Sequence, residues 1–143
     1  MMRVVIVGGG IVGVSTAYYL AKLKSDDIEI TIVEANEIAG SASGKAGGFL
    51  ARDWHGRGAE AEIARRSFEL HEKLAEELDD IGYRRCEALQ VTCPGSKSAM
   101  MTTWYDSVGS TSVIAPRDSA AQVVPYKLVR ALVERSKANV RIG

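Results

Sequence analysis

The feature that most restricts how this chain can fold lies in its first 34 residues. An uncharged, β-branched run at residues 4–7 predicts a buried strand, which leads into a glycine-rich turn and then into a helical pattern. A second apolar run, residues 28–34, ends in the acid Glu34. The spacing G-x-G-x-x-G is formed by three glycines: Gly8, Gly10 and Gly13. Strand, glycine turn, helix and second strand with a terminal acid are, in this order, the parts of a dinucleotide-binding βαβ unit.

Each of these glycines has a separate expected task. Gly8 allows the tight turn from strand to helix, Gly10 lets the backbone approach a pyrophosphate, and Gly13 lets the helix lie against the strand. The helix, expected over residues 11–24, directs unpaired N–H groups and its positive dipole end at the phosphates. Glu34 lies about 20 residues beyond the last glycine, where a carboxylate accepts hydrogen bonds from ribose hydroxyls and repels the 2′-phosphate of NADP.

Other interpretations of this stretch are weaker. The uncharged run over residues 4–21 is close to the length of a membrane span, about 20 residues, and it also has the apolar part that a signal peptide needs. Three consecutive glycines weaken a membrane helix, and the single Arg3 is a poor basic region for a signal peptide. Neither interpretation accounts for Glu34. A strand-turn-helix without a ligand is the plain alternative, and we expect the dinucleotide site instead.

The composition is that of an ordinary globular domain. The 18 basic and 18 acidic residues cancel, so there is no reason to expect nucleic acid or an anionic membrane as a partner. Cys86 and Cys93 are the only cysteines, too few for a disulfide framework or a metal site, and we expect both to be buried. No targeting segment is visible, so the predicted location is cytoplasmic.

A second glycine- and serine-rich segment, residues 39–51, follows closely after Glu34. Its simplest interpretation is a flexible loop. However, it contains Lys45 and ends in the apolar sequence Phe-Leu-Ala. Small side chains let the backbone pass close to a ligand, while hydroxyls and a lysine bind phosphate oxygens. We therefore predict a second contact strip along an extended dinucleotide.

The middle of the chain is expected to leave the nucleotide-binding unit. Residues 60–80 have helical periodicity, with Ile63 on the apolar face and His71 packed or half-exposed rather than a ligand. Residues 88–93 alternate as a strand does. Residues 97–112 show no clear period and are predicted to form a loop, with Met100 and Met101 filling gaps.

The last part of the chain is expected to return to the parallel sheet. Residues 122–124 are predicted to form a short strand. Pro125 suits the first turn of a helix that runs to residue 137. Residues 139–142 then form a strand, which we expect to lie beside the first one.

Together these motifs resemble the FAD-dependent oxidoreductases of the D-amino-acid oxidase and glycine oxidase type, in particular fungal members. The most specific parts are the glycine turn, the helix with Tyr18-Tyr-Leu-Ala, Glu34-Ala and residues 41–48. Residues 82–85 and 122–128 are less specific. The resemblance implies FAD, held non-covalently, and oxidation of a C–N bond, in which the carbon next to an amine gives up a hydride and dioxygen is the re-oxidant.

The resemblance also implies which residues contact FAD. The matching positions are Gly8, Gly10, Ile11, Gly13, Glu34, Ser43, Gly47, Gly48 and Phe49. The first four would contact the pyrophosphate, the acid would hold the adenosine ribose, and the last four would run toward the flavin. The substrate-binding arginine and tyrosine of the family lie further along a considerably longer chain. No catalytic residue and no metal ligand are therefore assigned here.

The expected fold is α/β, a Rossmann-like FAD-binding parallel sheet with helices, cut short. Residues 1–51 would form the βαβ core, 52–124 an excursion toward a substrate domain, and 125–143 the return to the sheet. We expect the FAD-binding part of an oxidoreductase that acts on amines or amino acids, inactive alone and, with apolar faces exposed, prone to associate. An NAD-dependent dehydrogenase domain and a non-catalytic interaction or trafficking protein are the alternatives. Residues 44–48 favour the flavin.

Overall fold

A computed structural model describes residues 2–23, 27–92, 100–102, 105–108 and 110–143 of the chain. The chain divides into two compact units. The first consists of Met1–Gly48, His71–Tyr83 and Val123–Gly143, and the second of Phe49–Leu70 and Arg84–Gln122. No helix in the described ranges is both long enough and apolar enough to cross a membrane.

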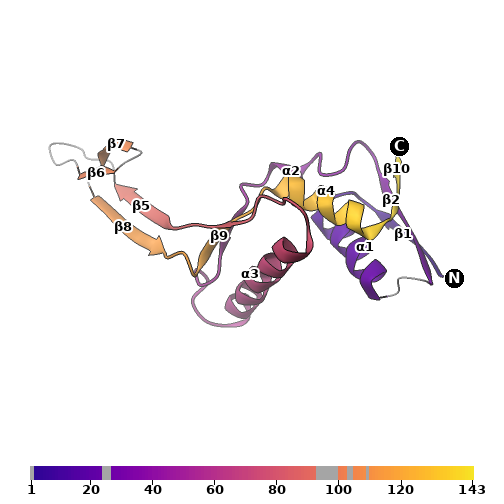
Figure 1. Cartoon of the computed structure of the whole chain (residues 1–143), viewed down its shortest axis with the longest axis horizontal. Coiled ribbons are helices and arrows are strands. Elements are labelled where there is room, and N and C mark those ends of the chain that lie inside the picture. Colours follow the sequence, from indigo (N-terminus) through magenta and orange to yellow (C-terminus); the bar gives the residue numbers. More distant parts are fainter. Residues whose placement is uncertain (1, 24–26, 93–99, 103–104, 109) are drawn as a thin grey trace. The chain divides into compact units, whose positions relative to one another are not determined.

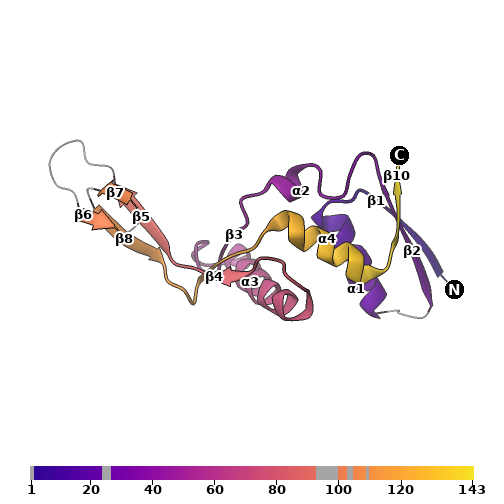
Figure 2. The same ribbon diagram turned by 45° about the horizontal axis from the view of Figure 1, so that its top comes forward.

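The first unit contains a parallel sheet with two helices on one face (Figures 1 and 2). Its strands, in spatial order, are β1 (Met2–Val7), β2 (Ile28–Glu34) and β10 (Asn139–Ile142). The helices α1 (Ile11–Leu23) and α4 (Pro125–Ser136) pack against each other, and a short helix, α2 (Ala42–Lys45), contacts α4. The expected α/β fold with a parallel sheet is thereby confirmed.

The position of the last strand differs from the prediction. We expected it beside β1, but β10 pairs with β2, with Val140 opposite Ile32 and Ile142 opposite Glu34. The first right-handed crossover moves the chain from β1 to β2, and the second continues in the same direction across the sheet. Two crossovers in one direction leave both helices on the same face, whereas a strand beside β1 would have required α4 on the other face.

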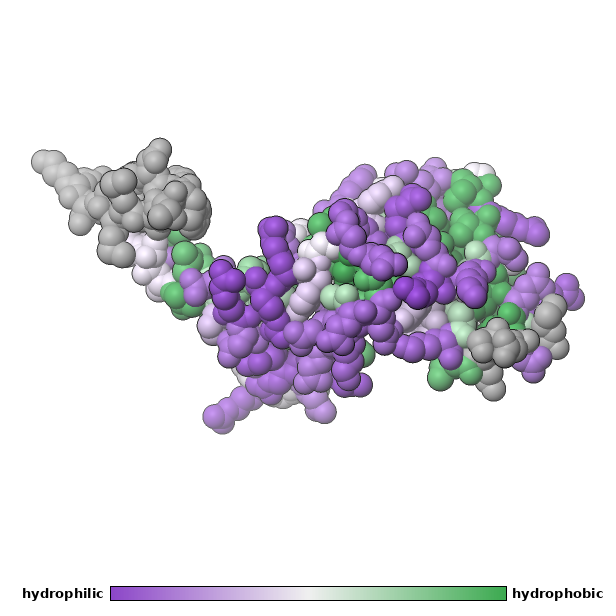
Figure 3. Space-filling view, viewed as in Figure 1, coloured by the Kyte–Doolittle hydropathy of each residue, from purple (hydrophilic) through white to green (hydrophobic). Residues whose placement is uncertain are grey.

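The core of the first unit lies between the sheet and its two helices. The largest fully buried side chains are Val14, Ile32, Val129 and Leu132. On β1, by contrast, Val5 and Val7 are 65% and 86% exposed. Figure 3 shows the resulting hydrophobic surface over the strands of this unit. One face of the sheet is thus packed. The run at residues 4–7 was predicted to be a buried strand, but only its alternate residues are partly covered, and Val5 and Val7 face outward.

The second unit is made of antiparallel strands and most of one helix. β3 (Phe49–Ala51), β9 (Ala120–Gln122) and β4 (Arg84–Arg85) form one sheet in that order. β5 (Ala88–Thr92) pairs with β8 (Ser110–Ala115), and β6 (Met100–Thr102) pairs with β7 (Tyr105–Val108). The helix α3 (Ala59–Glu77) starts in this unit, and its last residues, from His71, belong to the first unit.

Several local predictions for this region were wrong. Residues 97–112 are not a loop where they are described, because β6, β7 and the start of β8 form there. The strand β8 has no clear period because Val113 and Ile114, on opposite faces, are 54% and 44% exposed. Ile63 is also exposed.

The predictions for the two cysteines and for the paired methionines had different outcomes. Cys86 is only partly buried, although we expected a buried thiol. Cys93 and the side chains of Met100 and Met101 lie outside the described part of the chain.

Candidate dinucleotide-binding site

The glycine turn between β1 and α1 has the geometry that its sequence predicts. Gly8 has a φ of 104°, in the region that favours glycine, and its N–H donates to the carbonyl of Val33 at 2.8 Å. A Cβ on Gly13 would collide with the carbonyl oxygen of Gly8 and lie 3.2 Å from Ile6 Cγ2. The turn and the close helix–strand packing therefore both depend on glycine.

The carboxylate of Glu34 closes over this turn. Its Oε2 accepts a hydrogen bond from the N–H of Gly9 at 2.7 Å, and its Oε1 accepts one from the N–H of Asn36 at 3.0 Å. These two backbone donors, that of Gly9 foremost, lower the pKa of Glu34 below its usual value, so the group is ionised at neutral pH. Each carboxylate oxygen has a second lone pair, which leaves acceptor capacity for further donors such as hydroxyls.

Gly9, to which the sequence pattern assigns no task, is held from two sides. Its N–H donates to Glu34, and its carbonyl accepts from the N–H of Ala39 at 3.1 Å. A Cβ on Gly9 would lie 2.5 Å from Ile38 Cδ1. The segment after β2 therefore packs directly on the glycine turn. The signal in the sequence was the middle glycine of the run, at the position where the fingerprint accepts any residue.

Ser43 lies at the N-terminus of α1, although 32 positions separate it from the first residue of that helix. Its Oγ accepts a hydrogen bond from the N–H of Ile11 at 2.9 Å. A Cβ on Gly10 would lie 3.0 Å from the same oxygen, so glycine at this position makes room for the serine. Because the oxygen is the acceptor, the hydroxyl hydrogen stays available for an anion next to the helix end.

The remaining residues predicted to contact the cofactor do not gather at the glycine turn. Gly47 is exposed, and an added Cβ would meet no atom within 4 Å. Gly48 has a φ of 73°, and its carbonyl accepts from the N–H of Val123 at 2.9 Å. Phe49 begins the second unit, where its ring lies 5.0 Å from that of Trp54. The structure therefore brings Ser43 to the glycine turn, ties Gly48 to the start of α4, and places Phe49 in the other unit.

The residues gathered at the turn suit a dinucleotide. The N-terminus of α1 and the Ser43 hydroxyl supply donors for phosphate oxygens, and the ionised Glu34 supplies an acceptor for ribose hydroxyls. A Cβ on Gly8 would meet no atom within 4 Å, so the backbone at the turn borders open space. Among the described residues no group of three or more histidines, cysteines or acids could hold a metal ion.

Known proteins resemble this chain in sequence and in fold. The family described as FAD dependent oxidoreductase (DAO) matches residues 3–142. A protein of Schizosaccharomyces pombe that carries the name of an oxidoreductase is 34% identical over 155 residues, which cover 98% of this chain and 40% of that protein.

Solved structures agree in fold at low sequence identity. Glycine oxidase from Bacillus cereus has a TM-score of 0.76 at 22% identity, and the match covers 99% of this chain and 46% of that one. L-amino acid deaminase from Proteus myxofaciens has a TM-score of 0.68 at 19% identity, with 96% and 37% covered. The chain therefore spans less than half the length of each of these relatives.

Proposed function

This chain belongs to the FAD-dependent oxidoreductase family, with FAD as its cofactor, and on that premise we propose that it forms the FAD-binding part of an oxidoreductase acting on C–N bonds of amines or amino acids. The observation that carries the proposal is the meeting of the glycine turn, Glu34 and Ser43 at the N-terminus of α1. The likeness to a glycine oxidase and an L-amino acid deaminase supports the substrate class. We also propose that the protein is cytoplasmic.

The proposal gives the residues of the turn separate tasks. Gly8, Gly10, Ile11 and Gly13 would border the pyrophosphate, where α1 offers unpaired N–H groups. Glu34 would accept hydrogen bonds from the adenosine ribose with the lone pairs that Gly9 and Asn36 leave free. Ser43 would donate its hydroxyl hydrogen to a phosphate oxygen. Gly47, Gly48 and Phe49 would follow the cofactor toward the flavin.

The chemistry that bound FAD supplies is acceptance of a hydride from the carbon next to the substrate nitrogen, with dioxygen as the re-oxidant. The described residues contribute binding and orientation of the cofactor. We assign no catalytic residue to this chain. Because it spans 40% of the S. pombe relative, we propose that the 143-residue chain binds FAD weakly and does not oxidise amines by itself.

Equilibrium titrations of the chain with FAD and with NAD, side by side, test the cofactor-binding residues. We expect FAD to bind more tightly, and we expect Gly10→Asp to remove this binding because a carboxylate would occupy the phosphate position. Gln90→Glu adds the same charge on an exposed position of β5 and serves as the control. Circular dichroism checks that Gly10→Asp still folds, and Glu34→Gln offers a second, milder variant. Tighter NAD binding, or FAD binding unchanged by both site variants, would contradict the proposal.

A separate measurement tests the proposal for the isolated chain. The purified protein, supplied with FAD, is given glycine, other amino acids and simple amines while hydrogen peroxide is recorded. We expect no amine-dependent peroxide. A stoichiometric flavin spectrum together with peroxide release would show that the chain is active by itself. Binding of a protein partner that survives Gly10→Asp, without bound flavin, would favour a non-catalytic interaction role instead.

A further inference from the structure

The first unit contains a cavity at the end of the sheet opposite the glycine turn. This cavity of about 550 Å³ lies between α1, the start of β2 and the ends of α3 and α4. Ile28 and Ile30 line it where β2 begins, whereas Gly8 and Glu34 lie where β1 and β2 end. The cavity is therefore separate from the candidate dinucleotide site.

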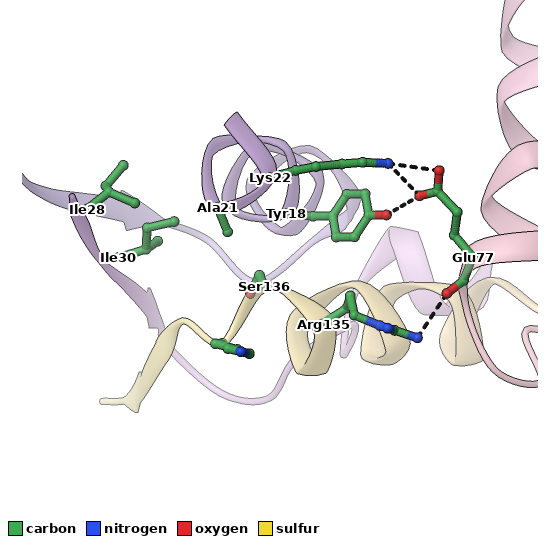
Figure 4. A pocket seen from close by; sticks show the side chains of 9 residues that line it. Tyr18, Ala21, Lys22, Ile28, Ile30, Glu77, Arg135 and Ser136 are labelled. Carbon is green, nitrogen blue, oxygen red and sulfur yellow. Dashed lines mark hydrogen bonds and ion pairs between the residues drawn. The ribbon is translucent and has the colours of Figure 1, made fainter. Parts of the chain in front are cut away.

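One side of this cavity is apolar. Ala21 of α1 and Ile28 and Ile30 of β2 form it, and Ile30 is only 5% exposed (Figure 4). Cavities that bind small organic molecules have such apolar walls together with a few polar groups that orient the ligand. The polar groups here are mainly cationic, because Lys22, Arg135 and Lys137 also line the cavity.

The single carboxylate in the lining, Glu77, is already engaged. It accepts hydrogen bonds from the hydroxyl of Tyr18 and from the ammonium of Lys22, which lies 2.8 Å and 2.7 Å from its two oxygens (Figure 4). Lys22 and Glu77 thus neutralise each other. They close the side of the cavity that faces the end of α3, and they leave two cations, Arg135 and Lys137, to set its net charge.

Those two cations are only partly compensated. Arg135 donates from Nη2 to the backbone carbonyl of Glu77 at 2.9 Å, and the carboxylate of Asp79 lies 3.8 Å from the same nitrogen and is fully exposed. Lys137 adopts a left-handed conformation at the end of α4 and has no ion pair within the described part of the chain. The end of α4 carries about half a negative charge from its dipole, which two full positive charges outweigh.

We propose that this cavity binds a small organic anion with an apolar body. The anionic group would contact Lys137 and Arg135, and the apolar body would lie against Ala21, Ile28 and Ile30. Inorganic phosphate has the charge without the apolar body and binds more weakly. Because the ligand does not reach the glycine turn, it and FAD bind to the chain together.

Phenylacetate and its uncharged analogue phenylacetamide are suitable probes, since they share the apolar body and differ in charge. Titration of the ¹⁵N-labelled chain at low ionic strength is followed through the backbone amides. We expect saturable shifts at residues 18–22, 28–30 and 135–138 with phenylacetate, and binding about threefold to fivefold weaker with phenylacetamide. Equal affinities, shifts outside these ranges, or no saturable shift would overturn the proposal.

Two variants that each remove one positive charge distinguish binding in this cavity from a general attraction of anions to the chain. Lys137→Met keeps the length of the side chain, breaks no ion pair, and should weaken phenylacetate binding about threefold to fivefold without changing phenylacetamide binding. Lys73→Met, on an exposed position of α3, should change neither. Equal effects of the two variants would contradict the proposal, as would displacement of phenylacetate by FAD.

Discussion

Glu34 and Glu77 belong to the same unit and both have lowered pKa values, but they are held in different ways. Glu34, at the end of β2, accepts hydrogen bonds from the backbone N–H groups of Gly9 and Asn36. Glu77, at the end of α3, accepts them from the side chains of Lys22 and Tyr18. The first carboxylate lies at the glycine turn, and the second closes the cavity at the other end of the sheet.

The difference shows how strongly each end depends on local sequence. Of the two backbone donors to Glu34, Gly9 is positioned by the glycine turn and Asn36 by the residues directly after β2, so the acid needs only to stand at the end of this strand. The partners of Glu77 come from a helix more than 50 positions earlier in the chain, and their meeting depends on how α1 and α3 pack. The glycine turn should therefore tolerate fewer backbone changes, and the α3 end fewer side-chain changes.

The largest expected effect is at the glycine turn. Gly13→Ala puts a Cβ against the carbonyl oxygen of Gly8, and backbone cannot move aside cheaply. We expect the free energy of unfolding, measured by urea denaturation, to fall by about 2 kcal/mol or more. Gly47→Ala is the control, because an added Cβ there meets no atom within 4 Å. Equal stability of the two variants would show that α1 does not depend on this close approach.

A smaller effect is expected from the serine that caps α1. Ser43→Ala removes the acceptor of the Ile11 N–H and should cost about 1 kcal/mol of unfolding free energy, as the loss of a helix cap does. Ser41→Ala should leave stability unchanged, because the side chain of Ser41 caps no N–H of α2. Thermal and urea unfolding of both variants measure the difference. Matching losses would indicate a general effect of the segment and not a cap.

At the other end of the unit, the hydroxyl of Tyr18 tests the cluster of side chains that Tyr18 forms with Lys22 and Glu77. Tyr18→Phe keeps the buried ring and removes the donor to Glu77, so we expect a loss of about 0.5–1 kcal/mol. Tyr19→Phe, on a ring that is 38% exposed, should have no measurable effect. Combining Tyr18→Phe with Glu77→Gln should give less than the sum of the two separate losses, because Tyr18→Phe removes the hydrogen bond that Glu77→Gln weakens by removing the charge of its acceptor.

The smallest expected effect is a difference in how pH and salt change the stability that the two carboxylates, Glu34 and Glu77, contribute. Both have folded pKa values below the unfolded value of about 4.3, so each stabilises the fold above that pH, and this contribution disappears as the pH falls through the folded pKa. Glu34→Gln and Glu77→Gln should each make the free energy of unfolding vary less with pH in the acid range. High salt should weaken the contribution of Glu77, whose partner Lys22 is charged, more than that of Glu34. Equal salt sensitivity would remove the distinction.

The elements with a continuous apolar run or a clear helical period could be predicted from the sequence. The first strand and helix, β2, α3, α4 and β10 all lie within a few residues of their predicted ranges. The strands β6, β7 and the start of β8 were missed. In β8 no alternation marks the strand, because Val113 and Ile114, on opposite faces, are both exposed. How the three predicted segments relate to domains of a whole protein stays a prediction.

The candidate site likewise has parts that the sequence predicted and parts that it did not. Gly8, Gly13 and Glu34 were placed by spacing, because each task depends on backbone conformation within one βαβ unit. The contact of Ser43 with Ile11 and the close packing at Gly9 were not visible in that spacing. Both join segments that meet only after the chain beyond β2 folds back over the turn.

The sequence by itself determined the cofactor class and the parallel βαβ unit, since a glycine spacing and a terminal acid act over short distances along the chain. Tertiary structure decided that β10 pairs with β2, that Ser43 caps α1, and that Lys22, Arg135 and Lys137 border one cavity. These features depend on the direction of chain crossovers and on side chains from separate helices. No local pattern of residues specifies either.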